Sequence, residues 1–129
     1  MGAEESWAQF LDWLTERHTK IKEAEDTAKS FLQKGDQEGY KEHLINRAKL
    51  LERMPLDARA VIDPLPEDLK MPVERALQRF ASSASMGLKL GSTFYLSALL
   101  YRDDHGVDEP DNLAYLLDEM RKAGLNFRG

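Results

Sequence analysis

The sequence predicts an all-α protein, a single helical bundle of four to five helices formed by residues 1–129. Three observations support this prediction. Apolar residues recur every three or four positions over long stretches, which is the spacing of one helix face. Glycine, proline and aspartate stand where these stretches begin or end. No stretch alternates apolar and polar residues as a half-buried strand would, and 42% hydrophobic residues suffice for one core.

The first predicted helix covers residues 6–34 and has an apolar stripe at seven-residue spacing. The centre of the stripe is formed by Trp7, Leu14, Ile21 and Ala28. Ser6 is expected to cap the beginning of this helix, because a serine side chain there can accept a hydrogen bond from an unpaired backbone N–H. Gly35 is expected to end it, because glycine readily adopts the left-handed conformation that follows a helix.

Gly35 and Asp36 form a turn so short that the second predicted helix, residues 37–54, must fold back antiparallel to the first. At a rise of about 1.5 Å per residue the first helix is about 43 Å long and the second about 27 Å, so the first extends beyond the second. The extending part carries an apolar sector of about 160°, which is too wide for one neighbouring helix. The sector, which we treat as a candidate interface, consists of Trp7, Phe10, Leu11, Trp13 and Leu14. Its second neighbour is either another helix of the chain or a second subunit.

A proline-rich crossover and a C-terminal helix are predicted in the rest of the bundle. Residues 55–71 contain three prolines, which interrupt regular structure, and a short helix is predicted within them over 56–62. The last helix is predicted from residue 110 or 111 to residue 122. Asp111 is a suitable N-cap for it.

A third long helix is predicted between these segments, over residues 72–102. Pro72 suits its first turn, where the missing N–H would be unpaired in any case. The glycines at 87 and 91 weaken a helix interior, so a break over 87–92 stays open. Around this possible break, every side of the helix carries small polar or apolar residues, and the helix is therefore expected to be the buried central one.

Ser83, Gly87 and Gly91 stand four residues apart on this third long helix. Small residues at that spacing let another helix approach closely. Two interpretations stay open. The face either packs tightly inside its own bundle, or it forms a homodimer seam or a groove for a small ligand between helices.

The densest polar cluster lies between the third and the last long helix, in residues 102–112. Carboxylate oxygens are the usual ligands of hard cations such as Ca²⁺ or Mg²⁺. The candidate ligand-binding residues are Tyr95, Tyr101, Arg102, Asp103, Asp104 and His105. The spacing does not match a calcium-binding helix–loop–helix, because Tyr101 falls where an aspartate is needed. The alternative is a solvated loop whose acids stabilise the beginning of the last helix, and no metal ligands are assigned.

Motifs of known enzyme chemistry are missing from the sequence. The chain has no cysteine, which excludes disulfides and thiolate metal sites. It also contains no zinc-protease, phosphate-loop or nucleophile-elbow motif. We therefore predict no catalytic residues and no cofactor, and an enzymatic function is not favoured.

The net charge and the hydropathy of the chain limit the classes of partner and the cellular location that we expect. The net charge is −5, and Lys and Arg are interspersed with Asp and Glu, so nucleic acid is not expected as a partner. The beginning of the chain lacks the pattern of a signal peptide, and no stretch is long and apolar enough for a membrane span. We therefore expect a cytoplasmic protein without a membrane partner.

Two functional hypotheses follow from these observations. The first is a protein-interaction or adaptor module that self-associates as a homodimer or binds another protein. It rests on the aromatic sector of the first helix, which needs a second neighbour, and on the missing enzyme motifs. The second is a small-molecule- or metal-binding regulatory protein with its site near residues 102–112.

Overall fold

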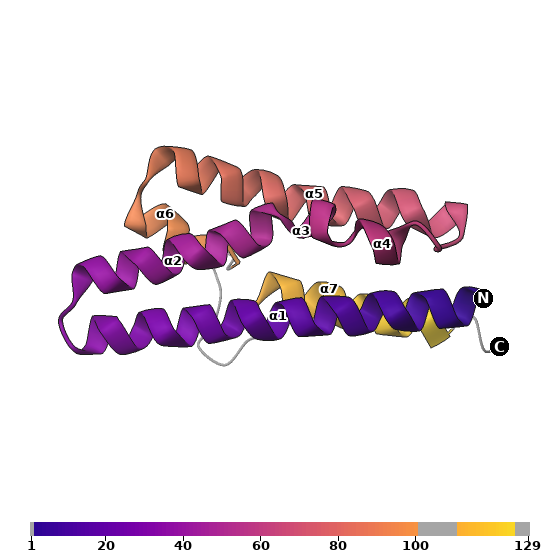
Figure 1. Cartoon of the computed structure of the whole chain (residues 1–129), viewed down its shortest axis with the longest axis horizontal. Helices are drawn as coiled ribbons and strands as arrows, with labels where there is room; N and C mark the ends of the chain where they lie inside the picture. Colours follow the sequence, from indigo (N-terminus) through magenta and orange to yellow (C-terminus); the bar gives the residue numbers. More distant parts are fainter. Residues whose placement is uncertain (1, 101–110, 126–129) are drawn as a thin grey trace.

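The computed structural model describes the backbone of residues 2–100 and 111–125 and the side chains as far as residue 122. In these residues the chain forms seven helices and no strand, which confirms the all-α prediction (Figure 1). The helices are α1 (Ala3–Gln33), α2 (Gln37–Glu52), α3 (Met54–Asp57), α4 (Arg59–Ile62), α5 (Glu67–Leu90), α6 (Thr93–Ala98) and α7 (Asn112–Leu125). The four long helices α1, α2, α5 and α7 correspond to the four long helices that the sequence predicts.

α1 and α2 form the predicted antiparallel hairpin (Figure 1). Gly35 has a φ of 81°, in the left-handed region, which lets the chain reverse directly after α1. The Asp36 carboxylate accepts a hydrogen bond from the Gly39 N–H at 2.9 Å and caps α2. The predicted cap of α1 is wrong, because the helix begins earlier. The Ser6 hydroxyl, inside the helix, donates to the Gly2 carbonyl at 3.0 Å.

The part of α1 that extends beyond α2 is covered by helices of the same chain. α3 and α4 continue along the direction of α2, and α4 contacts α1 (Figure 1). α7 packs antiparallel on α1, and the Trp7 indole N–H donates to the Met120 carbonyl at 3.2 Å. Trp7 also stacks on Phe10, with ring centroids 5.7 Å apart. The second neighbour that the aromatic sector needs is therefore α7, and burying the sector requires no second subunit.

α5 begins and ends at different residues from those predicted. It begins at Glu67, directly after Pro66, and Pro72 lies inside the helix instead of in its first turn. It ends at Gly91, whose φ of 62° is left-handed. The possible break over 87–92 is therefore present, and α6 follows it.

The position of α5 also corrects a prediction, because this helix is not the buried central one. It contacts α2 and the short helices α3, α4 and α6, and among the described residues it has no contact with α1 or α7. Its outer face is exposed, including Met71, Met86 and Leu90. Small residues fit both a buried and an exposed face, and Ser82 and Ser83 are exposed here. α1 and α2 lie in the middle of the bundle, between α7 and α5.

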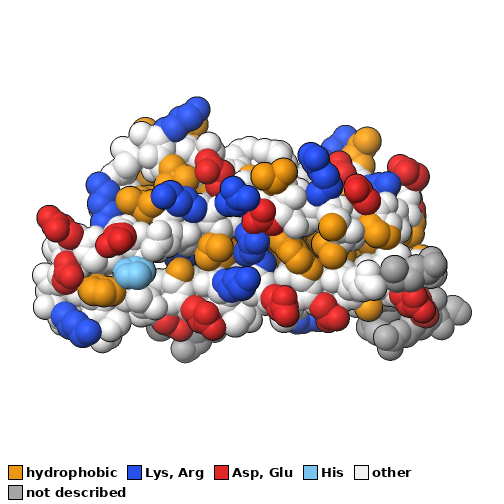
Figure 2. All heavy atoms as spheres, viewed as in Figure 1, with side chains coloured by type: hydrophobic (Ala, Val, Ile, Leu, Met, Phe, Trp, Pro, Cys, Tyr) orange, Lys and Arg blue, Asp and Glu red, His pale blue; other side chains and the backbone are white. Residues whose placement is uncertain are grey.

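One hydrophobic cluster draws buried residues from all seven described helices. On the face shown in Figure 2, acidic and basic side chains are interspersed, and hydrophobic side chains reach the surface in small groups. Among the described residues, no helix combines the length and the apolar character that crossing a membrane requires.

Candidate functional site

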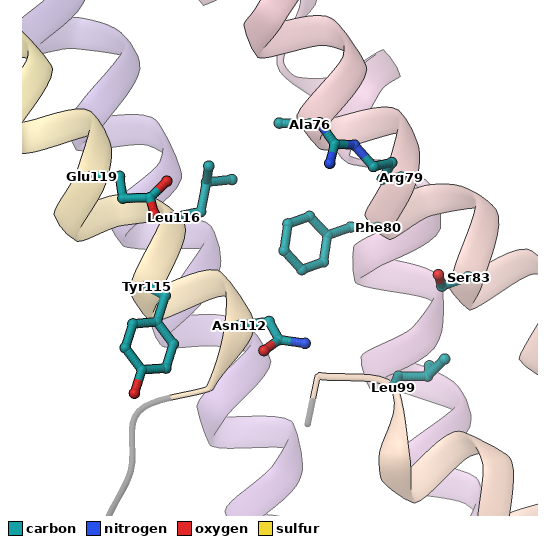
Figure 3. Close-up of a pocket in the computed structure, with 9 residues that line it drawn as sticks. All are labelled: Ala76, Arg79, Phe80, Ser83, Leu99, Asn112, Tyr115, Leu116 and Glu119. Carbon is teal, nitrogen blue, oxygen red and sulfur yellow. The ribbon is translucent and has the colours of Figure 1, made fainter. Parts of the chain in front are cut away.

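The candidate site is a groove between α5 and α7 (Figure 3). Both helices pack on the central hairpin, α5 on α2 and α7 on α1, and within the described ranges no Cα atom of α5 lies within 8 Å of a Cα atom of α7. The space between them has a volume of about 410 Å³. In a closed four-helix bundle the outer helices also pack together around the core. The described helices therefore form an open bundle, with a groove where the fourth helix–helix contact would be.

The α5 wall of the groove is built from residues three or four positions apart, which lie on one side of the helix. They are Ala76, Arg79, Phe80 and Ser83. Phe80 is partly buried against the core, and Figure 3 shows its ring in the space between the two helices. Arg79 and Ser83 are exposed at the rim. Leu99, which follows α6, adds an apolar side chain at one end.

The α7 wall has the same helical spacing. It consists of Asn112, Tyr115, Leu116 and Glu119. The neighbouring face of α7 holds its buried core residues, which are Leu113, Leu117 and Met120. Leu116 is partly buried and projects from this wall into the groove, whereas Tyr115 and Glu119 are exposed (Figure 3). α7 thus has one apolar face that packs on α1 and a mixed face, with Leu116 at the edge of the core, that lines the groove.

The groove combines an apolar floor with a polar rim. Phe80, Leu99 and Leu116 form the floor, and Arg79 and Glu119 stand on opposite rims. A lining of this kind suits a ligand that has an apolar centre and polar edges. Among the described residues, no three His, Asp or Glu side chains lie close enough together to hold a metal ion.

Asp111 fixes the beginning of α7 to α1 and so positions the α7 wall. Its carboxylate accepts a hydrogen bond from the Ala114 N–H at 2.8 Å, which confirms the predicted N-cap. The same carboxylate lies 3.1 Å from Nε2 of His18 and 4.0 Å from Nζ of Lys22 on α1. Burial opposes ionisation of Asp111, but the hydrogen bonds from His18 and Ala114 and the nearby positive charges outweigh it. The pKa of Asp111 therefore lies below its ordinary value.

The lowered pKa of Asp111 predicts a loss of stability in acid. A carboxylate whose pKa is lower in the folded state stabilises the fold above its ordinary pKa, and this contribution is lost as the pH falls through the folded value. We expect the free energy of unfolding to begin to decrease as the pH approaches the ordinary carboxyl pKa of about 4, and to go on decreasing until the pH has passed the lower pKa of the folded state. Asp57 contributes as well, because its hydrogen bond with Arg17 lowers its pKa.

Urea unfolding of Asp111→Asn at several pH values checks this expectation. Asparagine keeps the cap but cannot ionise, so the variant should be less stable at neutral pH and lose less stability on acidification. Asp63→Asn, at an exposed position, is the control and should keep the wild-type pH dependence. Parallel curves for Asp111→Asn and the wild type would contradict the role of Asp111.

A buried charge cluster centred on Arg47 of α2 links α2 to α6 and to α1. Arg47 of α2 is 1% exposed, and its guanidinium donates to the carbonyls of Leu96 and Ser97 at 2.5 Å and 3.4 Å. The Glu25 carboxylate of α1 lies 3.7 Å from the Arg47 guanidinium and 2.8 Å from the Lys22 ammonium. These partners all belong to the fold, so we interpret the cluster as structural.

Most of the predicted ligand-binding residues lie outside the described residues, namely Tyr101, Arg102, Asp103, Asp104 and His105. Tyr95 is described. It lies on α6, where its ring packs beside Gly87 of α5, and it is not part of the groove lining. A ligand site near residues 102–112 therefore stays a prediction.

The predicted interface residues of α1 belong to the core and its edge. Trp7, Phe10 and Leu14 are buried, and Leu11 and Trp13 are partly buried against the same cluster. Their contacts within the chain remove the reason for which a second subunit is expected at this sector.

The small-residue face of α5 is divided between three roles. Ser83 lines the groove. Gly87 lies beneath α6, where a Cβ atom would come within 3.1 Å of the side chains of Leu96 and Tyr95, so tight packing inside the bundle is its role. Gly91 ends α5.

The sequence pattern alone does not reveal the groove. Phe80 and Leu116 have the spacing of core residues, and Arg79 and Glu119 belong to no motif. The last helix gives one indication of the groove. Residues 112, 115, 116 and 119 have helical spacing and lie beside the buried apolar stripe of the same helix.

Comparisons of the chain with protein-family models, with curated proteins and with solved structures give no match. Function is therefore inferred from the geometry of the groove and the chemistry of its walls.

Proposed function

We propose that the protein is a protein-interaction module that holds an amphipathic helix of a partner in the groove between α5 and α7. The groove itself carries the proposal. An amphipathic helix binds by laying an apolar stripe, with anchors three and four residues apart, into a hydrophobic groove. The floor of Phe80, Leu99 and Leu116 offers such a surface, and the polar rim suits the flanks of the helix.

The open bundle favours a helical partner over an extended one. α5 and α7 present apolar side chains to the same space, while each of them packs only on elements to its other side. A helix placed between them packs against both walls by the ridge-and-groove fit that joins helices elsewhere. It would thus supply the contact that α5 and α7 do not make with each other.

A second copy of the chain is one candidate partner, because the sequence leads us to expect self-association. The aromatic sector of α1 does not supply the contact, since Trp7 and Phe10 are buried within the chain. The groove would then be the surface through which two copies meet. We place this interaction in the cytoplasm, in keeping with a chain that contains no cysteine.

Sedimentation velocity over a range of concentrations separates the two kinds of partner. A mass of 14.7 kDa at every concentration excludes a second copy as the occupant and leaves a different partner. Twice that mass, returning to the monomer value when the groove is filled by Ser83→Trp, identifies a second copy as the occupant.

The proposal predicts that a synthetic amphipathic helix binds to the groove and that filling the groove prevents this binding. The probe is a fluorescent peptide of about 18 residues with leucines at helical spacing. Ser83 is exposed and lines the groove, so Ser83→Trp puts a large side chain into the space without removing a core contact. We expect this variant to bind the peptide at least about tenfold more weakly than the wild type, as measured by fluorescence anisotropy.

Ser82→Trp is the matched control for this experiment. It makes the same substitution at the adjacent exposed residue of α5, which does not line the groove. Its affinity should equal that of the wild type, and circular dichroism should show that both variants are folded. Equal binding to the two variants, or no binding to the wild type, would contradict the proposal.

A small molecule is the second candidate occupant, because 410 Å³ falls within the range of about 300–1,000 Å³ that is usual for small-molecule pockets. With a small molecule in the groove, the protein would be a ligand-binding regulatory protein. Its metal-binding form, with a site near residues 102–112, is tested by titration calorimetry with Ca²⁺, Mg²⁺, Mn²⁺ and Zn²⁺. Titrations without heat at concentrations up to the millimolar range exclude these ions.

A further inference from the structure

We infer that the partner's helix carries acidic side chains along one flank of its apolar stripe and basic side chains along the other. This inference rests on the proposed function, since it specifies the occupant of the same groove. Figure 3 shows the Arg79 guanidinium and the Glu119 carboxylate projecting from opposite walls toward the same space. The two walls therefore carry charges of opposite sign.

The basic character of the α5 wall extends beyond Arg79. Arg75 lies one helical turn away and is exposed, and its guanidinium donates to the Met71 sulfur at 3.3 Å. A second hollow runs along the outer side of this wall, and its lining contains no acidic side chain. It is formed by Arg75, Gln78, Arg79, Ser82 and Ser83.

Glu119 gives the α7 wall the opposite sign. The preceding Asp118 carboxylate pairs with the Lys122 ammonium at 3.1 Å, so the charge of Asp118 is already compensated. Within the described ranges no ion pair involves Glu119 or Arg79. Both charges are thus available to a partner at the rim, next to a floor from which a bound helix would exclude water.

Opposite charges on the two walls select both the charge pattern and the direction of the bound helix. A helix with two acidic flanks would place acidic side chains beside Glu119, and the two negative charges would repel each other. A helix with two basic flanks would place basic side chains beside Arg79, with the same result. A helix with one flank of each sign matches both walls in one direction only. Reversing its direction exchanges the flanks and opposes like charges on both sides.

Three synthetic peptides test this inference. They share the leucine stripe of the probe described above and differ in their flanks, which are one acidic and one basic (the mixed peptide), both acidic, or both basic. We expect the mixed peptide to bind wild-type protein about three to ten times more tightly than either of the others at low salt, since each rim pair contributes modestly. High salt should reduce this difference, because the rim charges are exposed.

Charge reversal in the protein makes the test specific. Arg79→Glu should make the both-basic peptide the tightest ligand, and Glu119→Lys should do the same for the both-acidic peptide. Lys89→Glu is the control, because it reverses an exposed charge on α5 that does not line the groove. It should leave the order of the three peptides unchanged.

The failure of this inference can be told apart from the failure of the proposed function. If Arg79→Glu and Glu119→Lys both leave the wild-type order unchanged, the charge pattern is overturned. The proposed function still stands in that case, provided that Ser83→Trp weakens peptide binding at least about tenfold. If none of the three peptides binds to the wild type, the proposed function and this inference are both overturned.

Discussion

Replacing Phe10 with alanine is expected to lower the free energy of unfolding by about 3–5 kcal/mol. Phe10 is 0% exposed and stacks on Trp7 in the half of α1 that α4 and α7 cover. Removing its ring takes a large apolar surface out of the core and leaves a cavity that a packed interior cannot fully close. A loss of this size is a large fraction of the stability of an ordinary domain.

Chemical denaturation followed by circular dichroism measures this loss. Leu32→Ala is the control on the same helix, because Leu32 is 41% exposed, and it should change the free energy of unfolding by less than about 1 kcal/mol. A free energy of unfolding that stays the same in Phe10→Ala would contradict the packing of the aromatic sector inside the chain. If Phe10→Ala kept its stability but broke up an assembly, the aromatic sector would be a contact between subunits.

Replacing Arg47 with alanine is expected to lower the free energy of unfolding by about 3–5 kcal/mol as well. The substitution removes the donor to the Leu96 carbonyl and takes a counterion away from Glu25, which is itself buried. A buried charge that loses its partner is strongly destabilising. The remaining cations near Glu25, Lys22 and Lys29, lie at the surface and compensate only in part.

A double-mutant cycle gives the sharper test of this cluster. Glu25→Ala with Arg47→Ala should cost clearly less than the sum of the two single substitutions, because the second one removes the charge that the first left unpaired. Lys49→Ala, at an exposed position two residues further along α2, should stay within about 0.5 kcal/mol of the wild type. Strictly additive losses would show that Glu25 and Arg47 do not stabilise each other.

The turns and caps of this fold are predictable where one residue type has one local role. Gly35 has the left-handed conformation that its position after a helix predicts, and Asp36 and Asp111 cap the helices that follow them. Ser6 and Pro72 are counter-examples. A serine also fits inside a helix, where its hydroxyl bonds to a backbone carbonyl, and Pro66 suits a helix start as well as Pro72 does.

The groove is not predictable from the sequence. The spacing of apolar residues shows which of them share one face of a helix, but it does not show which other helix that face contacts. The width of the aromatic sector correctly predicts a second neighbour for α1. The sequence alone does not show whether this neighbour is α7 or a second subunit. In the same way, Phe80 and Leu116 have the spacing of residues that contact another helix. That α5 and α7 stand apart depends on the path of the chain between them, which no local pattern determines.

The most direct test of the proposed binding groove is a nuclear magnetic resonance titration of methyl-labelled protein with the mixed peptide. We expect the methyl signals of Ala76, Leu99 and Leu116 to shift, because these side chains line the groove. The signals of Leu32 and Leu56, which are exposed elsewhere on the molecule, should stay in place. Shifts confined to Leu32 or Leu56, or no shifts at all at saturating peptide, would contradict binding between α5 and α7.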